Sequence, residues 1–136
     1  MKKFYLLTLL LSFVFIGCNK DDDGGNNNNS AQVIDSWKLI GWVDNEVTPP
    51  QFHPEEECYS EVITFNDNNT GTVVINDCDA PAENTSFSWA ASGNGVYTLQ
   101  SGGLSETINI SFPEGNDKMY VTYPGDGPDA DIYQRQ

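Results

Sequence analysis

The 136-residue sequence predicts an all-β domain, an eight-stranded antiparallel up-and-down barrel, over residues 32–136. Two observations support this prediction. Apolar and polar residues alternate with a period of two over short runs, which is the pattern of half-buried strands. Clusters of Gly, Pro, Asn and Asp separate these runs and favour tight turns. We find no amphipathic helical pattern with credible capping residues.

The first expected strand spans residues 33–43. Simple alternation puts Trp37 and Val43 on one face of this strand and Trp42 on the other. A loop is expected next, over residues 45–57, because this segment is rich in proline.

Seven further strands are expected, over residues 61–65, 70–75, 86–90, 96–99, 104–112, 119–123 and 131–135. The turn at residues 66–69 consists of Asn and Asp, which tolerate left-handed or Asx-turn geometry. Closing the strands into a barrel would remove the exposed edges of the sheet. A β-sandwich with the same number of strands is the alternative.

Residues 1–17 have the features of a signal peptide. Lys2 and Lys3 precede an almost wholly apolar run over residues 4–16, which is too short to span a bilayer of about 30 Å as a mature helix. A buried core helix would give a similar run, but the position at the extreme N-terminus favours an export signal.

The end of this segment, Ile16-Gly17-Cys18, resembles a bacterial lipobox, although Phe15 stands where an aliphatic residue is usual. The resemblance implies a lipoprotein in which Cys18 carries a diacylglycerol and a further acyl chain such as palmitate. Several chains would anchor the protein firmly, because each buried methylene contributes about 0.8 kcal/mol. The alternative is cleavage by the ordinary signal peptidase, which would leave a soluble secreted protein with an unpaired cysteine.

Residues 18–31 are expected to form a tether. Asn19-Lys20-Asp21-Asp22-Asp23 is similar to the export signal that follows the lipidated cysteine in surface-exposed Bacteroidetes lipoproteins. This resemblance implies the outer membrane, with the domain on the cell surface. The following Gly, Asn and Ser residues cannot repay their ordering entropy, so they would hold the domain roughly 20 Å from the lipid. A plain solvated acidic linker is the alternative.

The charge of the chain limits its partners. Twenty acidic residues oppose six basic ones, which gives a formal net charge of −14. Nucleic acid is a poor partner, because binding requires cationic groups that neutralise phosphates. An anionic leaflet would also repel the domain, so we expect membrane association through the lipid alone, and a monomer.

Cys58 and Cys78 remain once Cys18 is assigned to lipid. They lie on the flanks of a hairpin-like segment, and in an oxidising envelope they should form a disulfide that contributes about 3 kcal/mol. A metal site is the alternative, but two cysteines and one histidine offer too few soft ligands.

The order of these features resembles the lipocalin-like domains of Bacteroidetes lipoproteins. The matching segments are Ile34-Asp35-Ser36-Trp37-Lys38-Leu39, Cys58, Ile63-Thr64-Phe65-Asn66, Gly71, Cys78, Phe87-Ser88-Trp89 and Ile132-Tyr133-Gln134-Arg135. Asp35 departs from the pattern, because lipocalins usually have Gly there. The resemblance implies that Trp37 packs against Arg135 at the closed end of the barrel, as a structural pair. A guanidinium over an indole contributes about 0.5–2 kcal/mol.

Catalysis is not expected, and neither is a cofactor. His53, the single histidine, could act as a general base or a metal ligand, but no positioned nucleophile accompanies it, and a solvated loop is the simpler interpretation. Oxygen ligands for calcium occur at residues 66–69 and 126–131, yet neither segment has the spacing of an EF-hand loop. Ordinary turn chemistry is the alternative at both places.

Aromatic residues are numerous for so small a domain, and the interior of an eight-stranded barrel either is filled or holds one small ligand. The side chains that we expect to contact such a ligand are Trp42, Trp89, Tyr97, Phe112 and Tyr120. The first hypothesis is therefore a non-catalytic, surface-anchored binding protein for a small hydrophobic ligand. The second is an accessory module with a filled barrel that docks a protein or glycan through residues 44–57 and 124–130.

Overall fold

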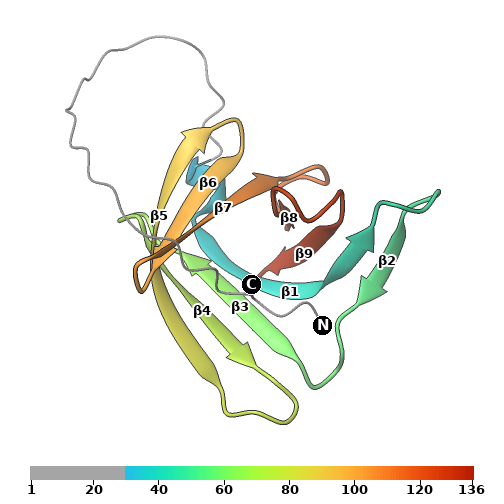
Figure 1. Cartoon of the computed structure of the whole chain (residues 1–136), viewed down its shortest axis with the longest axis horizontal. Coiled ribbons are helices and arrows are strands. Elements are labelled where there is room, and N and C mark those ends of the chain that lie inside the picture. Colours follow the sequence, from blue (N-terminus) through green and yellow to red (C-terminus); the bar gives the residue numbers. More distant parts are fainter. Residues whose placement is uncertain (1–29) are drawn as a thin grey trace.

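The computed structural model describes residues 30–136. The predicted signal peptide, the lipidation at Cys18 and most of the tether therefore lie outside the described residues. One antiparallel sheet contains nine strands in the order β2-β1-β3-β4-β5-β6-β7-β8-β9, and an additional pairing between β1 and β9 closes eight of them into a barrel (Figure 1). The predicted fold class is confirmed.

The elements are α1 (Ser30–Val33), β1 (Asp35–Asp44), β2 (Gln51–Pro54), β3 (Ser60–Phe65), β4 (Thr70–Asn76), β5 (Glu83–Gly93), β6 (Val96–Ser101), β7 (Leu104–Ser111), β8 (Lys118–Thr122) and β9 (Ala130–Arg135). Turns of a few residues, most of them containing Gly or Asn, connect many of these strands. Asn69 and Asn94 adopt positive φ angles of 63° and 54°, the left-handed conformation that asparagine tolerates.

Closure of the barrel depends on β1, which has a partner on each side. Its first half pairs with β3, from Asp35 opposite Phe65 to Lys38 opposite Val62. Its other edge pairs with β9, beginning with Trp37 opposite Arg135. The first and last strands of the domain are thus neighbours, and the sheet has no open edge along the barrel wall.

The expected loop over residues 45–57 was wrong in part, because Gln51–Pro54 forms β2. This strand pairs with the second half of β1, from Gly41 opposite Pro54 to Asp44 opposite Gln51. β1 is ten residues long and extends beyond its pairing with β3, so its free backbone groups are satisfied by the returning chain. Proline is tolerated because β2 is an edge strand. Figure 1 shows this hairpin extending away from the other strands.

The predicted faces of β1 were also wrong beyond residue 39. The register with β9 shifts between Leu39 and Gly41, which is a β-bulge. One extra residue reverses the facing of all later side chains. Trp42 consequently lies opposite Asp131, on the same face of the sheet as the core residue Tyr133, and Val43 turns outward.

The hydrophobic core fills the end of the barrel at which β1 begins. Trp37 and Met119 are fully buried there, and Val33 of α1 covers them. Gly71 makes room for an aromatic ring, because a Cβ atom at this position would lie 2.2 Å from Phe87 Cζ. Core and closure are both formed within residues 30–136, so this part of the chain has the properties of an independent folding unit. No helix among residues 30–136 is long and apolar enough to cross a membrane.

Candidate ligand-binding site

The two ends of the barrel differ in how their inward-facing side chains are covered. The closed end lies where β1 begins, next to α1. Trp37 is fully buried there, and its indole Nε1 donates a hydrogen bond of 2.8 Å to Val33 O. Arg135 lies over the ring of Trp37, with Cζ 4.5 Å from the ring centroid. Its Nη1 is 2.5 Å from Asp35 Oδ2, so first and last strands are also joined by an ion pair.

At the opposite end, which we call the open end, the inward-facing apolar side chains are less completely buried. Strand alternation places these residues on the same face as the core residues Ile108 and Tyr97, yet Leu104 is 45% exposed. They form what we call the aliphatic wall, which consists of Val73, Ile75, Leu99 and Leu104. The exposed side chain of Leu104 shows that the inward-facing apolar surface reaches solvent at this end.

A second set of side chains at the open end is polar, and it begins beside the aliphatic wall, because Glu61 lies opposite Ile75 in the register. Glu61 of β3 accepts hydrogen bonds on both carboxylate oxygens, from Tyr59 Oη at 3.0 Å and from Tyr133 Oη at 2.7 Å. This polar set, which we call the polar wall, consists of Tyr59, Glu61, Tyr123, Asp131 and Tyr133. Tyr133 is only 3% exposed, whereas its partner Glu61 is half-buried, so the hydrogen bond between them is partly buried.

The tyrosines of the polar wall remain neutral at any physiological pH. Burial raises the pKa of Tyr133 well above its usual value, and the neighbouring Tyr123 and Glu61 raise it further. Burial likewise raises the pKa of Tyr123, with additional contributions from the charges of Asp131, Glu61 and Glu106. The pKa of Tyr59 is raised by burial and by Glu61. These hydroxyls therefore stay protonated and continue to donate.

Aromatic residues of the β1–β2 hairpin stand beside the polar wall. Trp42 and His53 are opposite each other in the register, and their rings stack with centroids 4.3 Å apart. His53 is thus a half-buried strand residue rather than the solvated loop residue that the sequence suggested. Glu55 follows two residues after His53 in the sequence. Burial, together with the charge of Glu61, raises the pKa of its carboxyl group.

The structure does not bring together the five aromatic residues that were expected to contact a ligand. Trp89 and Tyr97 are buried in the core. Phe112 lies near the closed end, with its ring centroid 5.6 Å from that of Trp37. Tyr120 lies on the outer surface, where its hydroxyl donates to Glu114 Oε1 at 2.5 Å. Trp42 alone of the five lies at the open end, and it does so because of the β-bulge.

Sequence reasoning missed most residues of the two walls, although it had a usable signal. Glu61, Glu106 and Asp131 continue the inward-facing positions of strands whose other inward residues are apolar. Charged residues at core-facing positions near the end of a strand indicate that the barrel interior is wet there.

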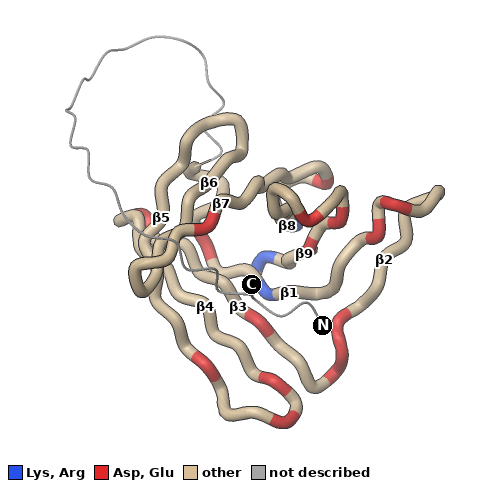
Figure 2. Tube along the Cα trace, in the orientation of Figure 1, with Lys and Arg blue, Asp and Glu red and all other residues tan. Residues whose placement is uncertain are grey.

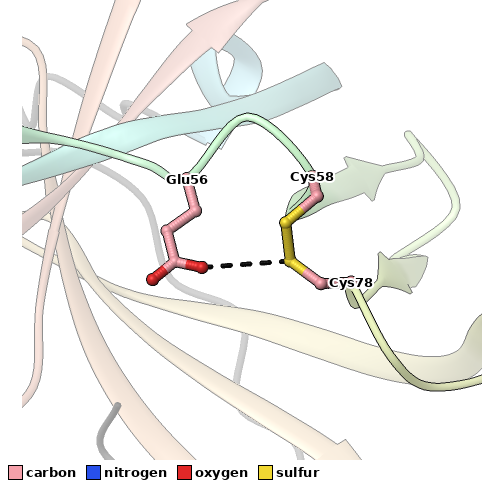
Figure 3. The surroundings of a disulfide bond; sticks show 3 residues. All are labelled: Glu56, Cys58 and Cys78. Carbon is pink, nitrogen blue, oxygen red and sulfur yellow. Dashed lines mark hydrogen bonds between the residues drawn. A yellow bond between two sulfur atoms is a disulfide. The ribbon is translucent and has the colours of Figure 1, made fainter.

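The disulfide between Cys58 and Cys78 lies at the same end, with Cα atoms 4.9 Å apart (Figure 3). It joins the segment before β3 to the segment after β4, and Tyr59 of the polar wall is its immediate neighbour. The Glu56 carboxylate lies 3.9 Å from Cys78 Sγ. A disulfide sulfur carries no proton, so we treat this approach as a contact rather than a hydrogen bond.

Metal binding finds little support among residues 30–136. The one group of three metal-ligating side chains that comes close together there is Glu56, Cys58 and Cys78. Its sulfur atoms are consumed by the disulfide and are unavailable as thiolate ligands. Asp126, Asp129 and Asp131 of the suggested calcium segment do not form such a group.

A hollow of about 510 Å³ lies outside the barrel, over β4, β5 and β6. Neutral hydroxyl and amide side chains line most of it, including Thr72, Ser88 and Gln100. These residues alternate along their strands with the core-facing Gly71, Phe87 and Leu99, which places them on the outer face. The hollow is shallow and open to solvent.

Basic side chains are kept away from the open end in the described part of the chain. Figure 2 shows many acidic positions along the described trace and few basic ones, near β1, β8 and β9. Arg135 is paired with Asp35 at the closed end, and Lys118 is paired with Glu114 at 2.7 Å. Lys38 is exposed and points outward between the buried Trp37 and Leu39.

The sequence of this barrel domain matches a known family. The family model described as a lipocalin-like domain matches residues 33–123, more than half of the chain. The chain belongs to the lipocalin-like domain family. In this lipocalin-like protein the matched span runs from the end of α1 to just past β8, and β9 with Arg135 lies beyond it. No curated protein and no solved structure matches the chain.

Proposed function

We propose that this lipocalin-like protein is a non-catalytic, surface-anchored lipoprotein that holds a small hydrophobic ligand at the open end of its barrel. The observation that carries the proposal is the aliphatic wall, because its inward-facing side chains are half-buried, or exposed in the case of Leu104, whereas those at the closed end are buried. Covering such side chains with a ligand removes apolar area from water, at about 25 cal/mol per Å². Family membership supports a binding function.

Anchoring is proposed from the sequence. The apolar segment and Cys18 favour attachment through acyl chains, and the acidic run after Cys18 favours the outer face of the outer membrane. Metabolic labelling with palmitate tests this directly. We expect label on the wild-type protein and none on the Cys18→Ala variant, and label that persists on the variant would contradict the proposal.

Ligand binding can be tested on residues 18–136 carrying Cys18→Ser, so that no acyl chain competes for the site. The probe is N-phenyl-1-naphthylamine, a neutral dye whose fluorescence increases in apolar surroundings. We expect saturable binding, weakened about tenfold or more by Leu104→Asp, which places a charge on the aliphatic wall.

Val47→Asp is the matched control, because Val47 is also an exposed aliphatic residue, at 37%, but lies outside the barrel strands. It should leave binding of the dye unchanged. Absence of saturable binding, or equal effects of the two variants, would refute a ligand site at the open end.

A second candidate function is docking of a protein or glycan through the loops. It is favoured by Phe52, which is 50% exposed on β2, and by the neutral hollow over β4, β5 and β6. If the dye does not bind and Phe52→Ser abolishes association with envelope extracts, the docking function replaces the first one.

A further inference from the structure

One side of the outer barrel surface carries no charged side chain. Within β4, β5, β6 and β7 only Glu83 and Glu106 are charged, and both lie at inward-facing positions. The outward-facing positions of these strands, which we call the neutral face, are Thr70, Thr72, Val74, Asn76, Asn84, Ser86, Ser88, Ala90, Val96, Thr98, Gln100, Ser105, Thr107, Asn109 and Ser111. Because 19% of the chain is charged, roughly three charges would be expected among these positions.

The hollow of about 510 Å³ lies on the neutral face, and none of its lining residues is charged. The members of the neutral face that line it are Thr70, Thr72, Ser86, Ser88 and Gln100. In the register, Thr70, Ser88 and Gln100 are partners on three neighbouring strands, and Ser105 of β7 continues this row. Neighbouring strands are about 4.8 Å apart, so the row is roughly 14 Å long.

Several polar side chains of the hollow have no hydrogen-bond partner within residues 30–136. The hydroxyl of Thr70 is engaged, because it donates to Asn68 Oδ1 at 2.6 Å. The side chains of Thr72, Ser88 and Gln100, by contrast, make no hydrogen bond to any other residue of this range. Hydroxyl and amide groups both donate and accept. A ligand can therefore bind these groups in place of water without breaking any hydrogen bond of the fold.

The composition of the neutral face restricts the chemistry of its partner. Nucleic acids, acidic glycans and basic peptides are bound through groups of opposite charge, which this face lacks. Protein interfaces are depleted in serine and depend on aromatic or large apolar anchors. The large apolar side chains that are exposed among the described residues are Val47, Phe52 and Leu104, and none of them lies on this face. An uncharged, polyhydroxylated ligand matches the hydroxyl and amide groups that are present.

We infer that the neutral face binds an uncharged glycan. One sugar residue would lie in the hollow against Thr72, Ser88 and Gln100, and adjacent sugars would follow the row towards Ser105. The site is on the outside of the barrel, so the inference does not depend on a hydrophobic ligand at the open end. Of the second candidate function it retains the hollow and assigns it one occupant.

Affinity electrophoresis in native gels tests the inference, because neutral hydrogen bonds contribute little net affinity and this method reports weak binding. Residues 18–136 carrying Cys18→Ser migrate through gels that contain hydroxyethyl cellulose, dextran or galactomannan, with bovine serum albumin as the reference. We expect at least one of these neutral polysaccharides to retard the domain in a concentration-dependent manner. Polygalacturonate, an acidic polysaccharide, should not retard it.

Amide-removing variants assign the binding to the neutral face. Gln100→Ala should raise the apparent dissociation constant roughly 3- to 10-fold, and addition of Ser88→Ala should raise it further. Gln51→Ala is the matched control, because Gln51 is also an exposed strand amide but lies on β2. It should leave the retardation unchanged. The double variant Ser88→Ala, Gln100→Ala should still bind N-phenyl-1-naphthylamine, which separates this site from the open end.

Three results would overturn the inference. The first is that none of the three neutral polysaccharides retards the domain. The second is retardation that survives in Ser88→Ala, Gln100→Ala, or that Gln51→Ala or Leu104→Asp reduces equally, because the glycan would then bind elsewhere. The third is a domain that sediments as a dimer and becomes monomeric on Gln100→Ala, because the face would then hold a second copy. In each case binding of the dye decides the proposed function separately.

Discussion

Arg135→Ala tests whether the closed end is the structural clamp of the barrel. The guanidinium donates to Asp35 Oδ2 at 2.5 Å, to Asn116 O at 2.8 Å and to Gln32 O at 3.2 Å, and it covers Trp37. The cation–π contact is worth about 0.5–2 kcal/mol, and a hydrogen bond involving a charged group about 1.5–3 kcal/mol. The side chain is 27% exposed, which screens part of this interaction. We therefore expect a loss of about 2–4 kcal/mol.

Thermal unfolding followed by circular dichroism measures this loss. For a domain of about a hundred residues, 1 kcal/mol corresponds to about 4–8 °C, so the expected decrease in Tm is about 10–25 °C. Lys118→Ala is the matched control, because it also removes the cation of an ion pair, but a surface pair within one segment. That pair is exposed to solvent, so its loss should lower the Tm much less than Arg135→Ala does.

Arg135→Lys separates charge from geometry. Lysine keeps the positive charge but lacks the planar fork that reaches three acceptors at once, so most of the loss should remain. If Arg135→Ala unfolds at the same temperature as Lys118→Ala, the clamp does not exist in solution and the reasoning is refuted.

Three further predictions follow from the fold. Gly71→Ala should destabilise the domain by about 3 kcal/mol in urea unfolding, because the new Cβ would lie 2.4 Å from Thr64 O. Gly102→Ala, with open space around its Cβ, should cost only about 1 kcal/mol for its left-handed backbone, and equal effects of the two variants would contradict the packing. The double variant Cys58→Ser, Cys78→Ser should lose about 3 kcal/mol in the same assay, and an unchanged midpoint would show that the disulfide contributes no stability. The five described tyrosines all have raised pKa values, and that of Tyr120 is raised to about 12. The stability that they contribute is therefore complete below pH about 10, the pKa in the unfolded chain, and is lost as the pH rises through the pKa values of the folded state. An absorbance titration should therefore show tyrosine ionisation delayed until the domain unfolds, and normal ionisation of a folded domain near pH 10 would contradict the burial of these groups.

The barrel could be predicted from the sequence because each strand carries its own alternating pattern and each turn its own residues. Two features could not be predicted. The β-bulge between Leu39 and Gly41 follows from the pairing of β1 with β9, a contact between the two ends of the domain that no local pattern encodes. β2 forms because the overhanging half of β1 needs a partner, and this tertiary requirement overrides a proline-rich sequence.

The five aromatic residues of the ligand-site prediction are dispersed in the structure for a related reason. Aromatic residues were selected by type, but Trp89, Tyr97 and Phe112 are needed to fill the core and the closed end. The open end differs from the core in the solvent exposure of its inward-facing side chains rather than in their residue type. This exposure depends on how far each strand extends beyond the core. The useful signal in the sequence was the set of acidic residues at inward-facing positions.

Mapping a bound ligand by NMR tests the central claim most directly. Residues 18–136 with Cys18→Ser, labelled with ¹⁵N, are titrated with N-phenyl-1-naphthylamine. We predict chemical-shift changes at the amides of Glu61, Leu99, Leu104 and Tyr123, and none at those of Trp37 and Arg135. Shifts confined to the outer face around Thr72 and Ser88, or to the closed end, would contradict a ligand site in the open end of the barrel.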